Sequence, residues 1–178
     1  MEKNFVFLPS IILLLLFNTL INSQTEYVCA PCGDCDTAVY ISPGKCPACG
    51  MELVDKSTIK HSNITIDDVC DIVKNNKDAV ILDVRSKEEF EGTHKTRPNE
   101  GKLKGAININ VTELEEKINE LEKYKNSEII VYCSHAHRSQ VASHILTQNG
   151  FTNVKNMLQG ISKWEKHDSD CKNELFLK

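Results

Sequence analysis

The sequence predicts an α/β fold in which a parallel sheet carries helices on both faces, preceded by a small cysteine-rich module. Two observations support this. Beyond residue 62, short and continuously apolar runs alternate with segments of helical periodicity, as in a parallel sheet that is buried on both faces. Five of the eight cysteines lie between residues 29 and 49. This stretch has too few apolar residues to fold without a metal ion or disulfide bonds. We therefore divide the chain into a signal peptide (1–23), a cysteine-rich module (24–55), a linker (56–62) and an α/β domain (63–178).

Composition limits the number of cores and the kinds of partner. A chain of 178 residues with 40% hydrophobic content supports one α/β core and a small appendage, but hardly two full domains. The net charge of −4 offers no basic surface of the kind that neutralises many phosphates, which argues against a nucleic-acid partner. We expect a small-molecule or protein partner instead.

The N-terminal residues are typical of a secretory signal peptide. An apolar run from Phe5 to Leu20 follows Lys3 and ends in small and polar residues, so that cleavage after Ser23 would leave Gln24 first. The run is also nearly long enough to remain as a tilted membrane anchor, which needs about 17 to 25 apolar residues. We favour cleavage, and expect an exported protein, periplasmic or secreted, with a membrane partner only if the segment is retained.

Two cysteine pairs, Cys29-x-x-Cys32 and Cys46-x-x-Cys49, are separated by thirteen residues. This spacing lets two short turns bring four thiolates onto one tetrahedral ion, in a zinc-ribbon-like arrangement. Four thiolates suit zinc or cuprous copper. The alternative is a knot stapled by disulfides, which an oxidising compartment would favour. No organic cofactor is expected.

The same segment resembles the heavy-metal-binding domain that is found beside metal transporters. The resemblance rests on residues 27–29 and, more closely, on residues 43–53, Pro-Gly-Lys-Cys-Pro-Ala-Cys-Gly-Met-Glu-Leu. That family usually has a histidine where Cys32 stands, and Cys35 is additional. The resemblance implies a soft metal ion held by the paired cysteines, with Cys35 and the thioether of Met51 as further candidate ligands.

The α/β domain is predicted to begin with a helix, a strand and a short helix. Thr65, with a carboxylate three residues later, is a helix cap, and apolar residues at helical spacing between 66 and 73 place Cys70 in the core. Residues 80–84, Val-Ile-Leu-Asp-Val, predict a central parallel strand. Ser86 can cap the helical turn that follows it.

A loop, a strand and a helix are expected next. The loop from Gly92 to Gly105 is rich in basic and polar residues, and we expect it to be solvated. Residues 106–109 resume as a strand. Apolar residues at positions 111, 114, 118 and 121, with Glu and Lys between them, predict an amphipathic helix that packs on the core.

The last predicted strand leads directly into a cysteine. Residues 129–132, Ile-Ile-Val-Tyr, read as a buried strand, and apolar residues at helical spacing between 141 and 146 predict the next helix. Cys133 therefore lies at a strand-to-helix turn, outside the carboxyl end of a strand, where open α/β sheets bind ligands. Ile161 and Trp164 are expected to pack the final helix onto the sheet.

The loop after Cys133 has the composition of an anion cradle. Residues 134–139, Ser-His-Ala-His-Arg-Ser, can turn their backbone N–H groups toward the thiol at a helix N-terminus. The helix dipole and the guanidinium of Arg138 favour the thiolate or persulfide anion. His135 and His137 either add positive charge for an anionic donor or simply face solvent, and the sequence leaves both interpretations open.

Several motifs of the α/β domain together resemble the rhodanese family. They are Leu82–Arg85, Glu89-Phe90, Gly105-Ala106, residues 133–139, and Gly160 with Trp164, spread over roughly residues 60–168. The resemblance implies a sulfurtransferase in which Cys133 takes sulfane sulfur from a donor such as thiosulfate and hands it to a nucleophilic acceptor. It implies that Arg138 stabilises the loop and its charge. The anion would be bound by the amides of Ser134, His135, Ala136, His137 and Arg138, with Ser139 beginning the helix.

Two details of the loop bear on its activity. Four residues separate Cys133 from Arg138, one fewer than in the similar loop of cysteine phosphatases. The smaller ring suits a single sulfur atom, so that phosphatase and arsenate reductase activities are disfavoured. Ala136 stands where many rhodaneses have glycine, which adopts tight backbone angles at least cost, and we expect it to weaken activity.

Two functions of different classes remain open. The first is an enzyme that transfers sulfane sulfur through a Cys133 persulfide. The second is a non-catalytic protein that binds a soft metal or senses redox state and uses the α/β domain as a scaffold. Elsewhere, Cys171 is a candidate disulfide partner of Cys70, although sequence alone cannot place the two sulfurs within bonding distance.

Overall fold

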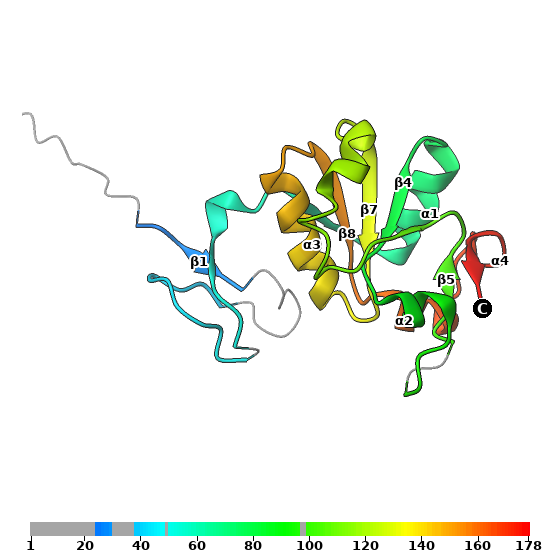
Figure 1. The fold of residues 1–178 in the computed structure, drawn as a ribbon, viewed down its shortest axis with the longest axis horizontal. Coiled ribbons are helices and arrows are strands. Elements are labelled where there is room, and N and C mark those ends of the chain that lie inside the picture. Colours follow the sequence, from blue (N-terminus) through cyan, green and yellow to red (C-terminus); the bar gives the residue numbers. More distant parts are fainter. Residues whose placement is uncertain (1–23, 30–37, 49, 97–98) are drawn as a thin grey trace, which may run out of the picture.

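The computed structural model describes residues 24–29, 38–48, 50–96 and 99–178 (Figure 1). The predicted signal peptide lies outside the described residues, as do Cys32, Cys35 and Cys49. Among the residues that are described, no helix is both long and apolar enough to cross a membrane.

A five-stranded parallel sheet forms the centre of the α/β domain (Figure 1). Its strand order is β3-β8-β7-β4-β6, and every neighbouring pair runs parallel. β7 is the middle strand, so that its carboxyl end opens at the middle of one sheet edge. The five strands are β3 (Ser62–Ile64), β4 (Val80–Asp83), β6 (Ile107–Asn108), β7 (Glu128–Tyr132) and β8 (Asn153–Met157).

The side chains of β7 alternate between two hydrophobic clusters, one on each face of the sheet. Ile129 and Val131 belong to one cluster, whereas Ile130 and Tyr132 belong to the other. The continuously apolar sequence of this strand follows from this burial on both sides. Helix α3 (His137–Gln148) contributes to the first cluster and helix α1 (Ile66–Asn75) to the second. The predicted α/β fold with helices on both faces is thus confirmed.

Two predicted helix starts are confirmed as capping boxes. At α1, Thr65 accepts a hydrogen bond from the backbone N–H of Asp68, and the Asp68 carboxylate accepts one from the backbone of Thr65. At the short helix α2 (Lys87–Glu91), Ser86 and Glu89 form the same reciprocal pair. The second box holds Glu89 in a buried position just beyond the carboxyl end of β4.

The amphipathic helix predicted over residues 111–121 is wrong in type. The chain forms turns there and then the 3₁₀-helix η3 (Ile118–Tyr124), which has no side-chain cap. Leu114 and Leu121 are nevertheless buried in the core, as the pattern required. Residues three apart lie on one side of either kind of helix, so the three-residue spacing within this pattern does not distinguish them.

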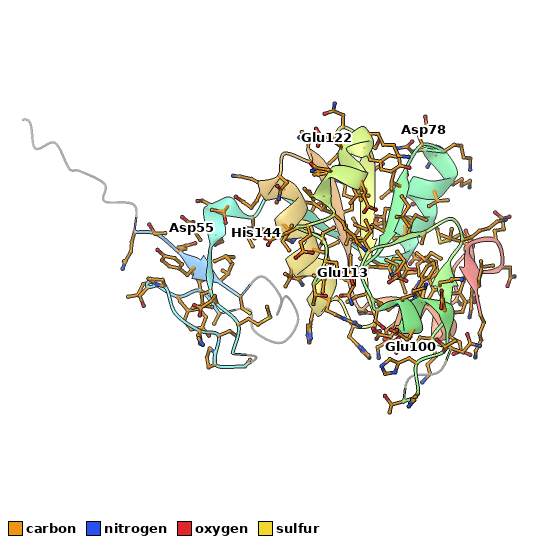
Figure 2. All side chains as sticks on the ribbon, in the orientation of Figure 1. Asp55, Asp78, Glu100, Glu113, Glu122 and His144 are labelled. Carbon is orange, nitrogen blue, oxygen red and sulfur yellow. A yellow bond between two sulfur atoms is a disulfide. The ribbon has the colours of Figure 1, made fainter. Side chains whose placement is uncertain are left out.

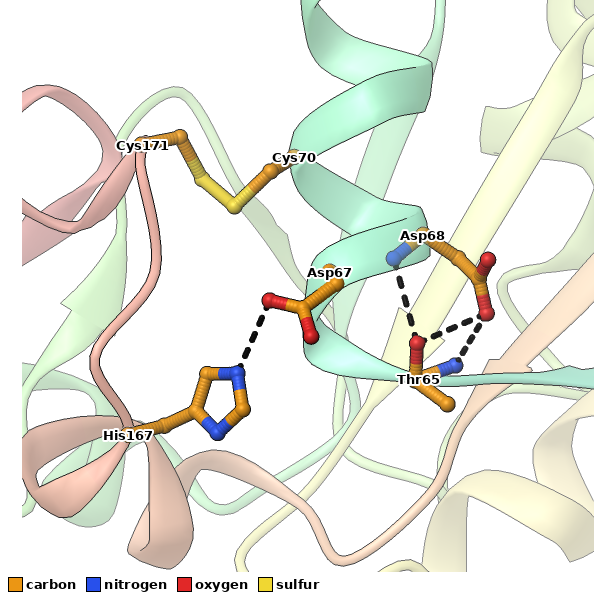
Figure 3. The surroundings of a disulfide bond; sticks show 6 residues. All are labelled: Thr65, Asp67, Asp68, Cys70, His167 and Cys171. Atoms are coloured by element: carbon orange, nitrogen blue, oxygen red, sulfur yellow. Dashed lines mark hydrogen bonds and ion pairs between the residues drawn. A yellow bond between two sulfur atoms is a disulfide. The ribbon is translucent and has the colours of Figure 1, made fainter.

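The C-terminal segment returns to the face of the sheet that carries α1. The 3₁₀-helix η4 (Ile161–Lys166) buries Ile161 and Trp164 there, in agreement with their predicted packing role. Cys171 forms a disulfide with Cys70 of α1 (Figure 3). Helix α4 (Lys172–Leu175) follows, and β9 (Phe176–Leu177) then pairs antiparallel with β5 (Lys102–Leu103). The predicted solvated loop therefore contains a short strand.

The described part of the cysteine-rich module is a small antiparallel arrangement. β1 (Tyr27–Val28) pairs with β2 (Val54–Asp55), and the 3₁₀-helix η2 (Lys56–Thr58) leads from it toward β3. Cys29 and Cys46 are buried together, with Leu53 packed against them. A hairpin turn surrounds Cys46, whose backbone N–H donates to the carbonyl of Met51 at 2.8 Å.

Candidate active site

The nucleophile predicted from sequence lies at the first position after the central strand. β7 ends at Tyr132 and α3 begins at His137, so that Cys133 opens the connecting loop. Its thiol is not part of a disulfide, and the residue is only 1% exposed. No side chain caps α3 within the described part of the chain, which leaves the first backbone N–H groups of this helix for an anion.

Two hydrogen bonds from the start of η4 hold the backbone of the Cys133 loop. The N–H of Ile161 donates to the carbonyl of Cys133 at 2.8 Å, and that of Ser162 donates to the carbonyl of Ser134 at 3.1 Å. Gly160 makes this close approach possible, because a Cβ atom built on it would lie 2.3 Å from the Ser134 carbonyl oxygen. Gly160, which was noted in the sequence as part of the family resemblance, is thus needed for a close contact between two backbone segments.

Ala136 adopts a backbone conformation that favours glycine. Its φ and ψ angles of 70° and −17° lie in the left-handed region, at the N-cap of α3. For a residue with a Cβ this conformation costs about 1–2 kcal/mol. Ser139 helps to hold it, since its hydroxyl lies 3.0 Å from the Ala136 carbonyl and 2.6 Å from Oδ1 of Asn156. The sequence argument about Ala136 therefore identified a strained position correctly.

Arg138 closes the loop against α2 instead of pointing at open solvent. Its guanidinium donates two hydrogen bonds to the Glu89 carboxylate, at 2.6 and 2.9 Å. These bonds raise the pKa of Arg138, and the charges of Glu89 and Cys133 raise it further against the effect of burial. The Glu89 side chain is 2% exposed, so the pair is a largely buried bidentate clamp.

Ser134 connects this clamp to a second carboxylate. The residue is fully buried, and its hydroxyl donates to Oε2 of Glu100 at 2.6 Å while accepting from Nη2 of Arg138 at 3.2 Å. The Ser134 side chain is therefore occupied inside the protein. Only the backbone N–H of Ser134 can therefore contact a bound anion.

A buried ion pair anchors the end of the neighbouring strand. The Arg85 guanidinium donates to both oxygens of Asp83, at distances between 2.6 and 3.0 Å, and also to the carbonyl of Gly101 at 2.9 Å. Burial alone would lower the pKa of Arg85, but the hydrogen bonds and charge of Asp83 raise it above its usual range. Arg85 is fully buried, and its bond to the carbonyl of Gly101 fixes the loop that follows α2.

The two loop histidines lie on the outside. His135 and His137 are both exposed, on either side of the buried Ala136. Their position fits a solvent-facing role and also leaves them where an incoming donor would meet them.

Sequence reasoning overlooked the two glutamates of this site. Glu89 was named only within the Glu89-Phe90 motif of the rhodanese resemblance, with no role or partner assigned to it. Glu100 lies in the loop that was expected to be solvated, yet its side chain is only 16% exposed. A buried partner for the arginine of the loop was foreseeable in principle, because Glu89 follows the end of a neighbouring strand.

The predicted metal ligands are brought together only in part. Cys29 and Cys46 share one small buried cluster, while Met51 is 45% exposed at the edge of the hairpin. The other three cysteines lie outside the described residues. Among the described residues, no group of three or more His, Cys, Asp or Glu side chains is arranged to hold a metal ion.

Comparison with known proteins identifies relatives of the α/β domain. Residues 65–167 match the family described as Rhodanese-like domain. The adenylyltransferase and sulfurtransferase UBA4 of Candida albicans is 28% identical over 150 residues, which cover 72% of this chain and 32% of that protein. Thiosulfate sulfurtransferase GlpE of Coxiella burnetii is 29% identical over 91 residues, covering 51% of this chain and 76% of that protein.

A solved structure supports the same fold. The reduced CoADR-RHD of Bacillus anthracis aligns with a TM-score of 0.51 and 23% identity, over 66% of this chain and 18% of that one. At this identity the likeness concerns the fold alone. The chain spans between 32% and 60% of the lengths of several curated relatives that it matches.

Proposed function

The chain belongs to the rhodanese-like family, and on that premise we propose that it is a sulfurtransferase that carries sulfane sulfur as a persulfide on Cys133. The observation that carries the proposal is the placement of this thiol. Cys133 is a cysteine outside any disulfide, at the carboxyl end of the central strand and at the uncapped start of a twelve-residue helix. The sulfurtransferases among the relatives support the same reaction class.

The reaction proceeds in two displacements on sulfur. The Cys133 thiolate attacks the outer sulfur of a donor, the donor S–S bond breaks, and its electron pair leaves with the donor remnant, which is sulfite when the donor is thiosulfate. A nucleophilic acceptor then attacks the outer sulfur of the persulfide. The S–S bond to Cys133 breaks, the thiolate is regenerated, and the acceptor leaves with the sulfur.

The loop supplies the electrostatics for both steps. Each displacement leaves negative charge on sulfur, and backbone N–H groups at the start of α3 stabilise such charge together with the helix dipole. The Arg138–Glu89 clamp keeps the loop closed around these groups. The donor and acceptor are small molecules or proteins that expose sulfane sulfur or a thiophilic group.

Intact mass tests this proposal. Purified wild-type protein incubated with thiosulfate is expected to gain the mass of one sulfur atom and to lose it on addition of cyanide. Cys133→Ser is expected to gain none, with an unchanged circular dichroism spectrum. Absence of the adduct on folded, reduced wild-type protein, with thiosulfate and with a persulfide donor alike, would refute the proposal.

We propose further that the protein is exported and works in the periplasm or outside the cell. The apolar run at its start supports this, and so does the disulfide between Cys70 and Cys171, because disulfides persist mainly in oxidising compartments. Fractionation of cells that produce the full chain tests it. Full-length protein in the cytosol, with its first 23 residues retained, would contradict it.

We propose a second function for the cysteine-rich module, the binding of zinc or cuprous copper. The supporting observation is the burial of Cys29 and Cys46 in one cluster, although their sequence positions are far apart. Thiolates suit either metal. Metal analysis of the full chain is expected to find about one ion per chain, and Cys29→Ser with Cys46→Ser is expected to lose it. Metal-free wild-type protein with these cysteines in disulfides would refute metal binding.

A further inference from the structure

Glu100 is a carboxylate that contacts the residue after the nucleophile, and it comes from a loop with no other role in the proposed chemistry. Its Oε2 accepts the Ser134 hydroxyl at 2.6 Å, and Ser134 directly follows Cys133. Figure 2 shows Glu100 beside α2, at the end of the molecule where the loop lies. The next residue, Gly101, is fixed through its carbonyl by Arg85. The position of the carboxylate is thus set by the fold.

The charge of Glu100 is only weakly compensated among the described residues. Arg85 approaches it at 3.5 Å, but the same guanidinium makes shorter contacts with Asp83. Arg138, the other guanidinium of the described site, is held in a bidentate pair by Glu89. Each arginine therefore has a closer carboxylate of its own, and Glu100 adds a third negative charge to the described site.

A negative charge at this position has different effects on different donors. Thiosulfate carries two negative charges, and binding at the Cys133 loop would bring both toward Ser134, the residue that Glu100 contacts. A persulfide on a thiol presents its outer sulfur on an uncharged chain of atoms, with at most one negative charge on the reacting group. Coulomb repulsion therefore acts more strongly on thiosulfate.

We infer that Glu100 is a specificity-determining residue that selects a thiol-borne persulfide over a free sulfur dianion as the donor. The inference rests on the proposed sulfurtransferase function. In the selected step, the Cys133 thiolate attacks the outer sulfur of R–S–SH, the donor S–S bond breaks, and R–S⁻ leaves. The outer sulfur and its proton remain on Cys133, so that atoms and charge balance.

The test compares Glu100→Gln with Glu115→Gln in the full chain. Glutamine keeps the shape of the side chain and its capacity to accept from Ser134, and Glu115 is an exposed carboxylate between β6 and η3. kcat/KM is measured for thiosulfate and for the persulfide of 2-mercaptoethanol, whose chain carries no charge, at low and at high salt. Glu100→Gln is expected to raise the ratio of the thiosulfate value to the persulfide value about tenfold at low salt, as expected for one unit charge acting on a dianion.

Salt provides a readout that a purely structural role would not produce. Because ions screen the long-range repulsion that a charged donor meets on its approach, the gap in this ratio between wild type and Glu100→Gln is expected to narrow at high salt, while Glu115→Gln follows wild type throughout. An unchanged ratio in Glu100→Gln, or an equal loss with both donors, would overturn the inference while leaving the sulfurtransferase function in place. Absence of any sulfur on Cys133, with both donors and in wild type also, would instead refute the proposed function.

Discussion

The two faces of the central sheet use cysteine in opposite ways. On the face that carries α3, Cys133 packs into the core cluster as a thiol outside any disulfide, beside the open N-terminus of the helix. On the face that carries α1, Cys70 sits on the buried side of the helix and is bonded to Cys171 (Figure 3). Both are buried cysteines of one domain, so burial alone does not set their roles.

The difference lies in what the backbone places next to each sulfur. Cys133 emerges from a strand into a loop whose N–H groups are not used by a cap, and such a position favours reactive sulfur. Cys70 lies inside a regular helix, where backbone N–H groups are already paired, and the C-terminal segment brings Cys171 to a Cα–Cα distance of 5.4 Å. One cysteine thus serves chemistry, and the other serves stability.

Removing the disulfide is expected to have the largest effect on stability. It links residues 101 positions apart, and closing a loop of that size restricts the unfolded chain by about 4–5 kcal/mol. Cys70→Ala with Cys171→Ala should therefore lower the free energy of unfolding by about that amount in urea titrations. Sulfur uptake by Cys133 should persist under native conditions, since the two sites lie on opposite faces.

A reductant supplies the control for this prediction. The disulfide lines a cleft of about 790 Å³, which gives a small thiol access to it. Dithiothreitol should destabilise the wild type and leave the double variant unchanged. Equal stability of reduced and oxidised wild type would show that the disulfide does not restrict the unfolded chain, and the contrast between the two faces would then be lost.

The clamp on the Cys133 face is expected to give the next largest effect. Arg138→Met leaves the Glu89 carboxylate, 2% exposed, without its bidentate partner, which should cost about 3 kcal/mol of unfolding free energy. Sulfur uptake should fall as well, because the loop is then no longer held against α2. Urea unfolding and intact mass measure the two effects separately.

The double variant Arg138→Met with Glu89→Met tests the cause. It removes both charges, so it should recover part of the stability lost in Arg138→Met, but not the sulfur uptake. The two side chains do not act as a pair if their effects on the free energy of unfolding are additive. In that case the double variant is less stable than Arg138→Met by the loss that Glu89→Met causes alone.

Much of the fold and the position of the nucleophile were predictable because they depend on local patterns. Apolar runs and caps located β4, β7, α1 and α2, and the strand-to-helix transition located Cys133. These features are encoded within a few neighbouring residues. The type of the segment that contains η3 was not predictable, because the same apolar spacing suits two kinds of helix.

The carboxylates of the site depend instead on contacts that are distant in sequence. Glu89 and Arg138 are separated by 49 residues, and Ser134 and Glu100 by 34. Such partners are set by which strand ends meet at the sheet edge and by the path of one long loop, and neither follows from periodicity. The pairing of Cys70 with Cys171 was an open alternative for the same reason.

Ala136→Gly gives the smallest expected effect and tests the strain in the reactive loop directly. Glycine relieves the left-handed conformation at φ 70° but makes the unfolded chain more flexible, so the free energy of unfolding should rise by only about 0.5–1 kcal/mol. Ala142→Gly is the matched control, since Ala142 lies buried within the same helix. There, glycine should instead destabilise by about 1 kcal/mol. Urea unfolding of both variants distinguishes these signs. If both variants are less stable than wild type, the loop holds Ala136 without strain. Alanine in place of glycine would then not destabilise the loop of the reactive cysteine.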